Sequence, residues 1–185
     1  MLLEERIAGN LKGRYYESPL FNSSPYERFG WLYSGDPFFP LEVREVWKIY
    51  NNALKKYNVV MDYGQEVDER RRFMKSPVFV AADTDIKRVV GGIWIDYSYP
   101  TGEKTEFGNK KAAVFHINAL RSHRHAAYPL MDFFRDIISK HCHYLEIHWD
   151  RRTHEDDPSN FLKNNGFVVK GDSEGGSAFL NLYPT

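Results

Sequence analysis

The feature that most constrains the fold is a change of hydrophobic period near the middle of the chain. Apolar residues recur at helical spacing before Val78, and after it they come in short continuous runs. Three such runs follow one another without a helix-length break, which favours antiparallel strands. The predicted elements are helices at 41–57 and 66–74, strands at 78–82, 89–97 and 112–120, a helix at 129–140 and a strand at 144–149.

The last strand, helix and strand of that series predict a β-α-β unit, so one parallel pair joins an otherwise antiparallel sheet. After it, Asp157-Pro158 is typical of a helix start and Gly166 of a helix end. Two closing strands follow, at 167–169 and 178–182. We therefore expect an α/β (α+β) fold with a central mixed, mostly antiparallel sheet flanked by helices.

The N-terminal part is less regular. Leu3, Ile7 and Leu11 recur every four residues, which predicts a short helix over 2–11. From 12 to 40 the chain is rich in Pro, Gly, Ser and aromatic residues and is expected to be an irregular arm, with a possible strand at 29–33. We accordingly divide the chain into an N-terminal helix and arm (1–27) and a main domain (28–185). Residues 101–111 are expected to form a polar hairpin loop.

Composition excludes several classes of protein. The chain has 185 residues, equal numbers (25 each) of basic and acidic residues, and 16% aromatic residues, so it has the apolar content of a folded domain and is not globally basic. Its single cysteine, Cys142, cannot form an intramolecular disulfide. No apolar run is long enough to cross a membrane, and no signal-peptide pattern is visible. These features predict a cytoplasmic protein that does not bind membranes, and nucleic acid is an unlikely partner.

Two motifs carry a resemblance to a known family. Val89 to Ile95 contains a glycine, Gly91, after two aliphatic residues, and Asn165-Gly166-Phe167 follows the last predicted helix. With the order of elements, these residues resemble the GCN5-related N-acetyltransferase (GNAT) superfamily over about residues 28–183. The resemblance implies a transferase that moves an acyl group, typically acetyl from acetyl-CoA, to an amine on a small molecule or a protein.

The resemblance also implies a cofactor-binding loop. In that family the loop before the helix at 129–140 holds the CoA pyrophosphate through backbone N–H groups and the helix N-terminus. The family's loop usually reads Arg or Gln, two residues, Gly, one residue, then Gly or Ala. Here Ser122 stands at the first of those positions and His125 at the first Gly, and only Ala127 fits the pattern. Leu162 stands where the family often has a tyrosine that protonates the thiolate. The expected cofactor-contacting residues are Leu120, Arg121, His123, Arg124, His125, Ala126 and Ala127.

Candidate catalytic residues lie on the two strands that the family uses for chemistry. Alternation places His116 and Asn118 on one face of their strand, and Glu146 and His148 on one face of the other. A histidine is suited to act as a base at neutral pH, and Asp150 at a strand end could orient one. The alternative for each is an ordinary structural role. His141-Cys142-His143 lacks the spacing of a zinc site, so no metal is expected.

Two other functions remain open at this point. An inactive protein with the same fold could bind or inhibit a partner protein through the aromatic arm (15–39). A related transferase could modify a nucleobase or tRNA, using Arg70 to Arg72 for phosphate contacts. Strong salt dependence of binding would distinguish the second function.

Overall fold

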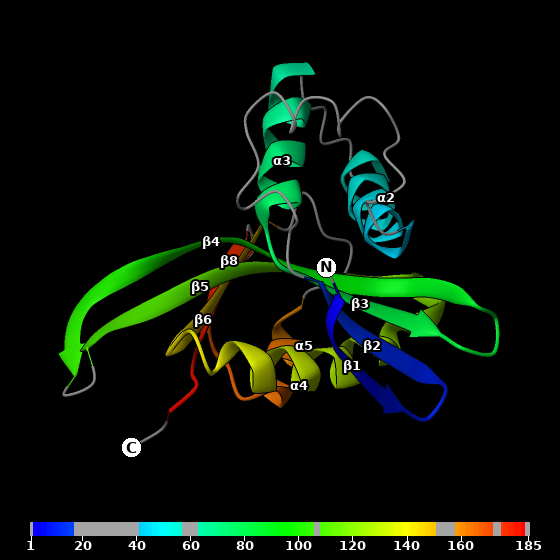
Figure 1. Ribbon diagram of the computed structural model, residues 1–185. Helices are drawn as coiled ribbons and strands as arrows, with labels where there is room; N and C mark the ends of the chain where they lie inside the picture. The colour runs from blue at the N-terminus through cyan, green and yellow to red at the C-terminus, as the bar shows by residue number, and fades with distance from the viewer. Residues whose placement is uncertain are drawn as a thin grey trace.

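The computed structural model describes residues 2–16, 41–56, 63–105, 108–150, 158–171 and 175–183. Figure 1 shows a twisted sheet with α2 and α3 on one face and α4 and α5 on the other. In chain order the elements are β1 (Leu2–Ala8), β2 (Leu11–Tyr16), α2 (Leu41–Lys56), α3 (Tyr63–Lys75), β3 (Val78–Asp83), β4 (Arg88–Thr105), β5 (Gly108–Ala119), the 3-10 helix η2 (Arg121–Ala126), α4 (Ala127–Ile138), β6 (Tyr144–Asp150), α5 (Ser159–Asn164), β7 (Val168–Gly171) and β8 (Gly175–Asn181).

The sheet has the order β1-β2-β3-β4-β5-β6-β8-β7. The pair β5–β6 is parallel, and the other neighbours among the described strands are antiparallel. The parallel pair is connected through η2 and α4, as the predicted β-α-β unit requires. The mixed sheet with helices on both faces confirms the fold class expected from the sequence.

Each face of the sheet has its own hydrophobic core. The α4 face holds the larger cluster, in which Phe134 and Met131 are fully buried against sheet residues such as Phe115. The α2 face holds a second cluster around Trp94 and Val46. Gly92 permits the close approach of α2, because a Cβ added there would lie 2.5 Å from a Val46 methyl carbon. β4 runs through both Gly91 and Gly92 without a break.

The predicted helix at 2–11 is wrong, because these residues form a β-hairpin. β1 pairs with β2 from Leu2↔Tyr16 to Ala8↔Leu11, and Gly9-Asn10 makes the two-residue turn. Gly9 has a φ of 62°, which glycine adopts without strain. A four-residue apolar spacing is also a multiple of the two-residue strand period, so the spacing alone could not distinguish the two structures.

Three further expectations need correction. Residues 12–16 belong to β2 rather than to an irregular arm, and Tyr15 stacks on Phe79 with ring centroids 4.5 Å apart. Within the polar stretch 101–111, residues 101–105 belong to β4 and residues 108–111 belong to β5. The second helix is longer than predicted and buries Phe73 on the sheet. The remainder of the arm (17–40), with its possible strand at 29–33, lies outside the described residues.

Candidate active site

The sheet opens between its two parallel strands. β5 pairs with β6 only over Ala112–Val114, opposite Tyr144–Glu146. Beyond this point β5 remains paired with β4 up to Ala119, and β6 remains paired with β8 up to Asp150. Among the described residues, the later part of each strand therefore has a ladder partner on one side only.

The opening exposes backbone donors of β5. The Leu120 amide donates to the carbonyl oxygen of Val90, on the β4 side, at 2.8 Å. Because backbone groups alternate along a strand, the amides of Ile117 and Ala119 face the β6 side instead. This arrangement supplies N–H groups that can stabilise a negative charge between the two strands.

His116 lies on the α2 face of β5, two residues past the last pair with β6. Its ring stacks on Trp94, with centroids 4.4 Å apart and an interplanar angle of 19°. Its Nε2 lies 3.4 Å from Oδ2 of Asp96. The ring of Tyr50 meets His116 edge-on at 5.6 Å. These contacts fix the plane of the imidazole and assign Nε2 to a carboxylate, while the side chain stays 29% exposed.

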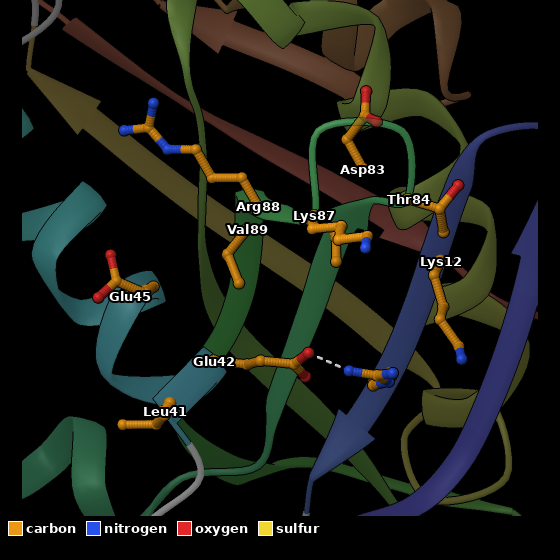
Figure 2. A pocket seen from close by; sticks show the side chains of 11 residues that line it. Lys12, Leu41, Glu42, Glu45, Asp83, Thr84, Lys87, Arg88 and Val89 are labelled. Carbon is orange, nitrogen blue, oxygen red and sulfur yellow. Dashed lines mark hydrogen bonds and ion pairs between the residues drawn. The ribbon is translucent and has the colours of Figure 1, made fainter.

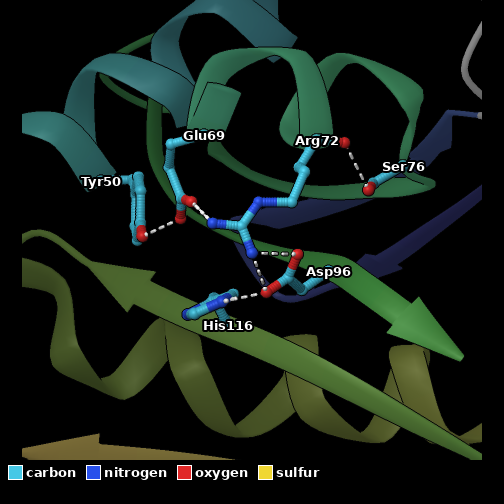
Figure 3. Close-up of polar contacts among 6 residues, drawn as sticks. All are labelled: Tyr50, Glu69, Arg72, Ser76, Asp96 and His116. Atoms are coloured by element: carbon cyan, nitrogen blue, oxygen red, sulfur yellow. Dashed lines mark hydrogen bonds and ion pairs between the residues drawn. The ribbon is translucent and has the colours of Figure 1, made fainter. Parts of the chain in front are cut away.

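The carboxylate of Asp96 belongs to a chain of ionic contacts shown in Figure 3. Arg72 Nη1 lies 3.3 and 3.2 Å from the two Asp96 oxygens, and its other terminal nitrogen contacts Glu69. Glu69 in turn accepts a hydrogen bond of 2.7 Å from the Tyr50 hydroxyl. Helices α2 and α3 are thereby connected to His116 through Asp96.

Protonation follows from these contacts. Burial alone would raise the pKa of Asp96, but the hydrogen bond to His116 and the nearby Arg72 charge together hold it below its usual value. Burial, and then the Glu69 hydrogen bond, raise the pKa of Tyr50. Asp96 is therefore a carboxylate at neutral pH, able to stabilise a protonated His116, and Tyr50 remains a neutral hydrogen-bond donor.

The lowered pKa of Asp96 predicts a pH-dependent stability. A carboxyl group whose folded pKa lies below its unfolded value of about 3.9 stabilises the fold above that pH, and the stabilisation is lost as pH falls through the folded pKa. We expect Asp96→Asn to be less stable than the wild type by a constant amount above about pH 5, and the difference to shrink below about pH 4. Urea unfolding at several pH values measures it.

Asp132→Asn, at an exposed position of α4, is the matched control for that series and should leave the pH dependence of stability unchanged. A gap between wild type and Asp96→Asn that stays the same from neutral to acid pH would contradict the assignment of an ionised Asp96.

A second polar group lies on β6. Glu146 Oε1 is 2.8 Å from His148 Nε2, and its other oxygen accepts a hydrogen bond from the Tyr99 hydroxyl. That hydrogen bond, with burial second, raises the pKa of Tyr99 to about 12. Like His116, His148 lies two residues past the last β5–β6 pair. Alternation from the Val114↔Glu146 pair places His116 and His148 on the same face, one on each strand beside the opening.

Of the five candidate catalytic residues, two pair with each other, one pairs with a residue outside the set, and two have no contact with the other candidates described here. His116 pairs with Asp96, which the sequence analysis did not select, and Glu146 pairs with His148. Asn118 lies opposite Gly92 on the same face as His116. Asp150 ends β6 opposite Gly175, and its side chain lies outside the described residues.

The expected cofactor-contacting loop is the helical turn η2. Arg121, Arg124 and His125 are exposed, whereas Ala126 is buried. His123 is half-buried, with its Nε2 3.7 Å from Asp83 Oδ2. Lys87 is the only non-glycine residue with positive φ in the described part of the chain, so the turn at 121–127 needs no glycine for its backbone conformation. η2 continues directly into α4, and its N-terminal end follows the end of β5.

A cavity of about 520 Å³ lies elsewhere, beside the first turn of α2. In Figure 2 Glu42 points across it to an arginine of β2, Arg14. Arg14 also contacts Glu5, and Lys12 pairs with the same carboxylate at 2.9 Å. None of the described lining residues is among the predicted catalytic or cofactor-contacting residues. They are Lys12, Arg14, Leu41, Glu42, Glu45, Ala82, Asp83, Thr84, Lys87, Arg88 and Val89.

The described residues form neither a metal site nor a membrane-spanning helix. No group of three or more His, Cys, Asp or Glu residues among them is arranged to hold a metal ion. None of the helices they form has the length and apolar character needed to span a bilayer.

Sequence reasoning missed Asp96 for an identifiable reason. Ile95 pairs with Phe115 and Tyr97 pairs with Val114, so Asp96 is the extra residue of a β-bulge. Two-residue alternation from Trp94 nevertheless places Asp96 on the same face as Trp94 and His116, and the bulge changes the face only from Tyr97 onward. The signal that could have found Asp96 was therefore the alternation of β4, which the sequence analysis considered only for β5 and β6.

Among the comparisons with known proteins, only the one with solved structures bears on the fold. No family model matches the sequence, and a search of the curated proteins finds no match. Among solved structures, the chain is similar to an N-acetyltransferase from Staphylococcus aureus (18% identity, TM-score 0.51, 77% of this chain and 93% of the other). It is also similar to the ribosomal-protein-S5-alanine acetyltransferase of Vibrio fischeri (10%, 0.54, 96% of both) and the spermidine N-acetyltransferase of Vibrio cholerae (15%, 0.52, 95% of both).

The class that these observations define is the GNAT fold. The mixed sheet, with helices on both faces, matches that of the solved N-acetyltransferases.

Proposed function

We propose that the protein is an N-acyltransferase that moves an acyl group from acyl-CoA, with acetyl-CoA as the expected donor, to an amine. The observation that carries the proposal is the β5–β6 opening with the His116–Asp96 pair beside it. A site for acyl transfer needs a base, donors for an oxyanion and a proton source for the leaving thiolate. Each can be supplied by groups on these two strands.

His116 is the proposed base. Its Nε2 is directed to Asp96, so Nδ1 is the nitrogen left to accept the proton of the attacking amine. The Asp96 carboxylate then stabilises the imidazolium, and Arg72 keeps the carboxylate in place. The stacking on Trp94 holds the ring at one orientation throughout the proton transfer.

The β5 amides of Ile117 and Ala119 face the opening and are the proposed donors to the oxyanion. As the amine nitrogen bonds to the acyl carbon, the negative charge develops on the carbonyl oxygen. The carbon–sulfur bond then breaks, and the thiolate needs a proton. Leu162 is fully buried on α5 and has no proton to give. His148, paired with Glu146 on the other strand, is the proposed donor.

The basic turn η2 is the proposed contact for the CoA phosphates. Arg121, Arg124 and His125 are exposed there, and the N-terminal end of a helical segment favours an anion. Calorimetric titration with acetyl-CoA tests the proposal. A ligand at 100 times its dissociation constant should add about 2.7 kcal/mol to stability, which a melting curve detects. No binding at millimolar acetyl-CoA would contradict the proposal.

Charge-reversal variants, together with a fragment of CoA, test whether η2 contacts the CoA phosphates. Arg121→Glu should weaken acetyl-CoA binding, whereas Lys140→Glu, an exposed charge reversal just after the far end of α4, should not. Pantetheine lacks the pyrophosphate, so its binding should be the same in wild type and Arg121→Glu. Equal weakening of pantetheine and acetyl-CoA would mean that Arg121→Glu disturbs the fold instead.

The remaining functions have less support. Arg72 is held by Glu69 and Asp96 and Arg71 contacts Asp68, so two of the three arginines proposed for tRNA phosphates have acidic partners within the chain. In the aromatic arm proposed for a protein partner, Tyr16 is buried and bonded to Glu42, and 17–39 lies outside the described residues.

A further inference from the structure

Two exposed tyrosines lie beside the β5–β6 opening. Tyr97 and Tyr99 of β4 are 51% and 37% exposed, and their ring centroids are 6.1 Å apart. Tyr97 is opposite Val114, the last residue of β5 that pairs with β6. In Figure 1 the β4–β5 ribbon continues beyond α3 from this point. The two rings are therefore accessible to a ligand that binds at the opening.

The strand register places these rings on the same face as the proposed base. Tyr97, Val114 and Glu146 form one row across β4, β5 and β6, and directly opposite residues share a face. His116 comes two residues after Val114, so its side chain lies on that face as well. The Tyr99 hydroxyl donates to Glu146, which agrees with this placement. An acceptor bound at His116 therefore has the two tyrosines next to it.

The charged side chains that contact the two histidines do not balance. Asp96 and Glu69 share one guanidinium group, that of Arg72 (Figure 3). Glu146 has His148 as its only ion-pair partner among the described residues. When both histidines are neutral, this group contains three carboxylates and one guanidinium. It therefore carries two net negative charges around the opening.

Two basic side chains on the same face of the sheet do not compensate for this excess. Lys110, at the start of β5, is paired with Glu103 at 2.9 Å and adds no net charge. Lys170 lies on β7, two strands beyond β6, which is about 10 Å away by the usual strand spacing. An exposed charge at that distance is largely screened at physiological salt.

We infer that the acceptor is an amine with a second cationic group, which binds over Tyr97 and Tyr99 beside Glu146 while the reacting nitrogen meets His116. The inference rests on the proposed acyl transfer and adds the chemical class of the acceptor. A cation is attracted to the face of a tyrosine ring, and Glu146 supplies an opposite charge at the same place. A singly charged amine neutralises one of the two excess negative charges, whereas a doubly charged amine neutralises both.

Strand geometry limits the length of this acceptor. His116 is two residues along β5 and one strand across from Tyr97, which separates their backbones by about 8 Å. The nitrogens of extended 1,5-diaminopentane are about 7 Å apart. Pentylamine has the same carbon chain without the second ammonium group, and 5-aminopentanoate has a carboxylate in its place. These three compounds differ in the charge that they bring to the two tyrosines.

The first test measures binding of the three compounds to the protein without acyl-CoA. An NMR titration measures affinities in the millimolar range. We expect 1,5-diaminopentane to bind about 10-fold more tightly than pentylamine, from the combined cation–π and ionic contacts. 5-Aminopentanoate should bind more weakly than either. The preference for the diamine should decrease as the salt concentration rises.

Variants locate the second cationic group. Tyr97→Leu should weaken binding of the diamine by about 2–5-fold and leave the affinity for pentylamine unchanged. Glu146→Gln removes one of the excess negative charges and should remove most of the preference. Tyr183→Leu, at a tyrosine after β8 that is 52% exposed, and Asp132→Asn, at an exposed carboxylate of α4, are the matched controls and should keep it. Circular dichroism confirms that each variant is folded.

Three results would overturn the inference. They are equal affinities of the wild type for the diamine and for pentylamine, a preference that both Tyr97→Leu and Glu146→Gln retain, and a transfer assay in which kcat/KM is the same for the two amines. The binding measurements need no acyl-CoA, whereas the proposed function is tested by acetyl-CoA binding. Failure of the inference and failure of the proposed function therefore give different results.

Discussion

Replacing His116 by alanine should lower kcat for acyl transfer by about 10²–10⁴-fold, the usual contribution of a positioned base. The acyl-CoA contacts are proposed to be made by η2 and by backbone amides of β5, none of which the substitution removes, so the KM for acyl-CoA should change little. Steady-state kinetics with the best amine acceptor from a screen measure both quantities.

His141→Ala is the matched control, because His141 is an exposed histidine in the turn after α4. It should retain full kcat. Asp96→Asn should have a smaller effect than His116→Ala, since it removes the orienting carboxylate and leaves the base. An undiminished kcat in folded His116→Ala would exclude this residue as the base, and His148→Ala would then be the variant to measure.

The sheet and its helices could be predicted from the sequence because their signal is local. Helix α2 buries Val46 and Tyr50 at the spacing that predicted it, and the runs that became β3, β4, β5 and β6 are continuous and apolar. The separation of β5 from β6 could not be predicted. Their pairing ends after Val114, although the residues on either side of that point follow the same alternating pattern, so the sequence carries no local signal for the separation.

Only part of the candidate site could be predicted from the sequence, because only part of it depends on local spacing. Face alternation located His116 and His148 correctly relative to their strands, because that property depends on two-residue spacing. Asp96 shares that spacing with Trp94, but its partner Arg72 comes from a helix 24 residues earlier, and their contact exists only in the folded chain. The prediction for the N-terminal residues was wrong because two local signals conflict there. Gly9-Asn10 favours a turn, whereas the apolar spacing suits either a helix or a strand.

The largest loss of stability is expected from Phe134→Ala. Phe134 is fully buried between the sheet and α4, with ring centroids 5.0 Å from Phe79 and 5.1 Å from Phe115. Removing the ring leaves a cavity that the rigid sheet cannot fill, at a cost of about 3–5 kcal/mol. A domain is stable by only about 5–15 kcal/mol, so the variant should be close to unfolding. Urea titration should show a lower midpoint with an unchanged slope.

Phe179→Ala is the control, because Phe179 lies on β8 with 42% of its surface exposed and its ring centroid 4.9 Å from that of Tyr144. The same atoms are removed, yet water already reaches the site, so the loss should stay below about 1 kcal/mol. Phe134 packs α4, the helix of the β-α-β unit, against β3 and β5, the two strands that flank β4. If the two substitutions lowered the free energy of unfolding by the same amount, Phe134 would not lie in a core between α4 and the sheet.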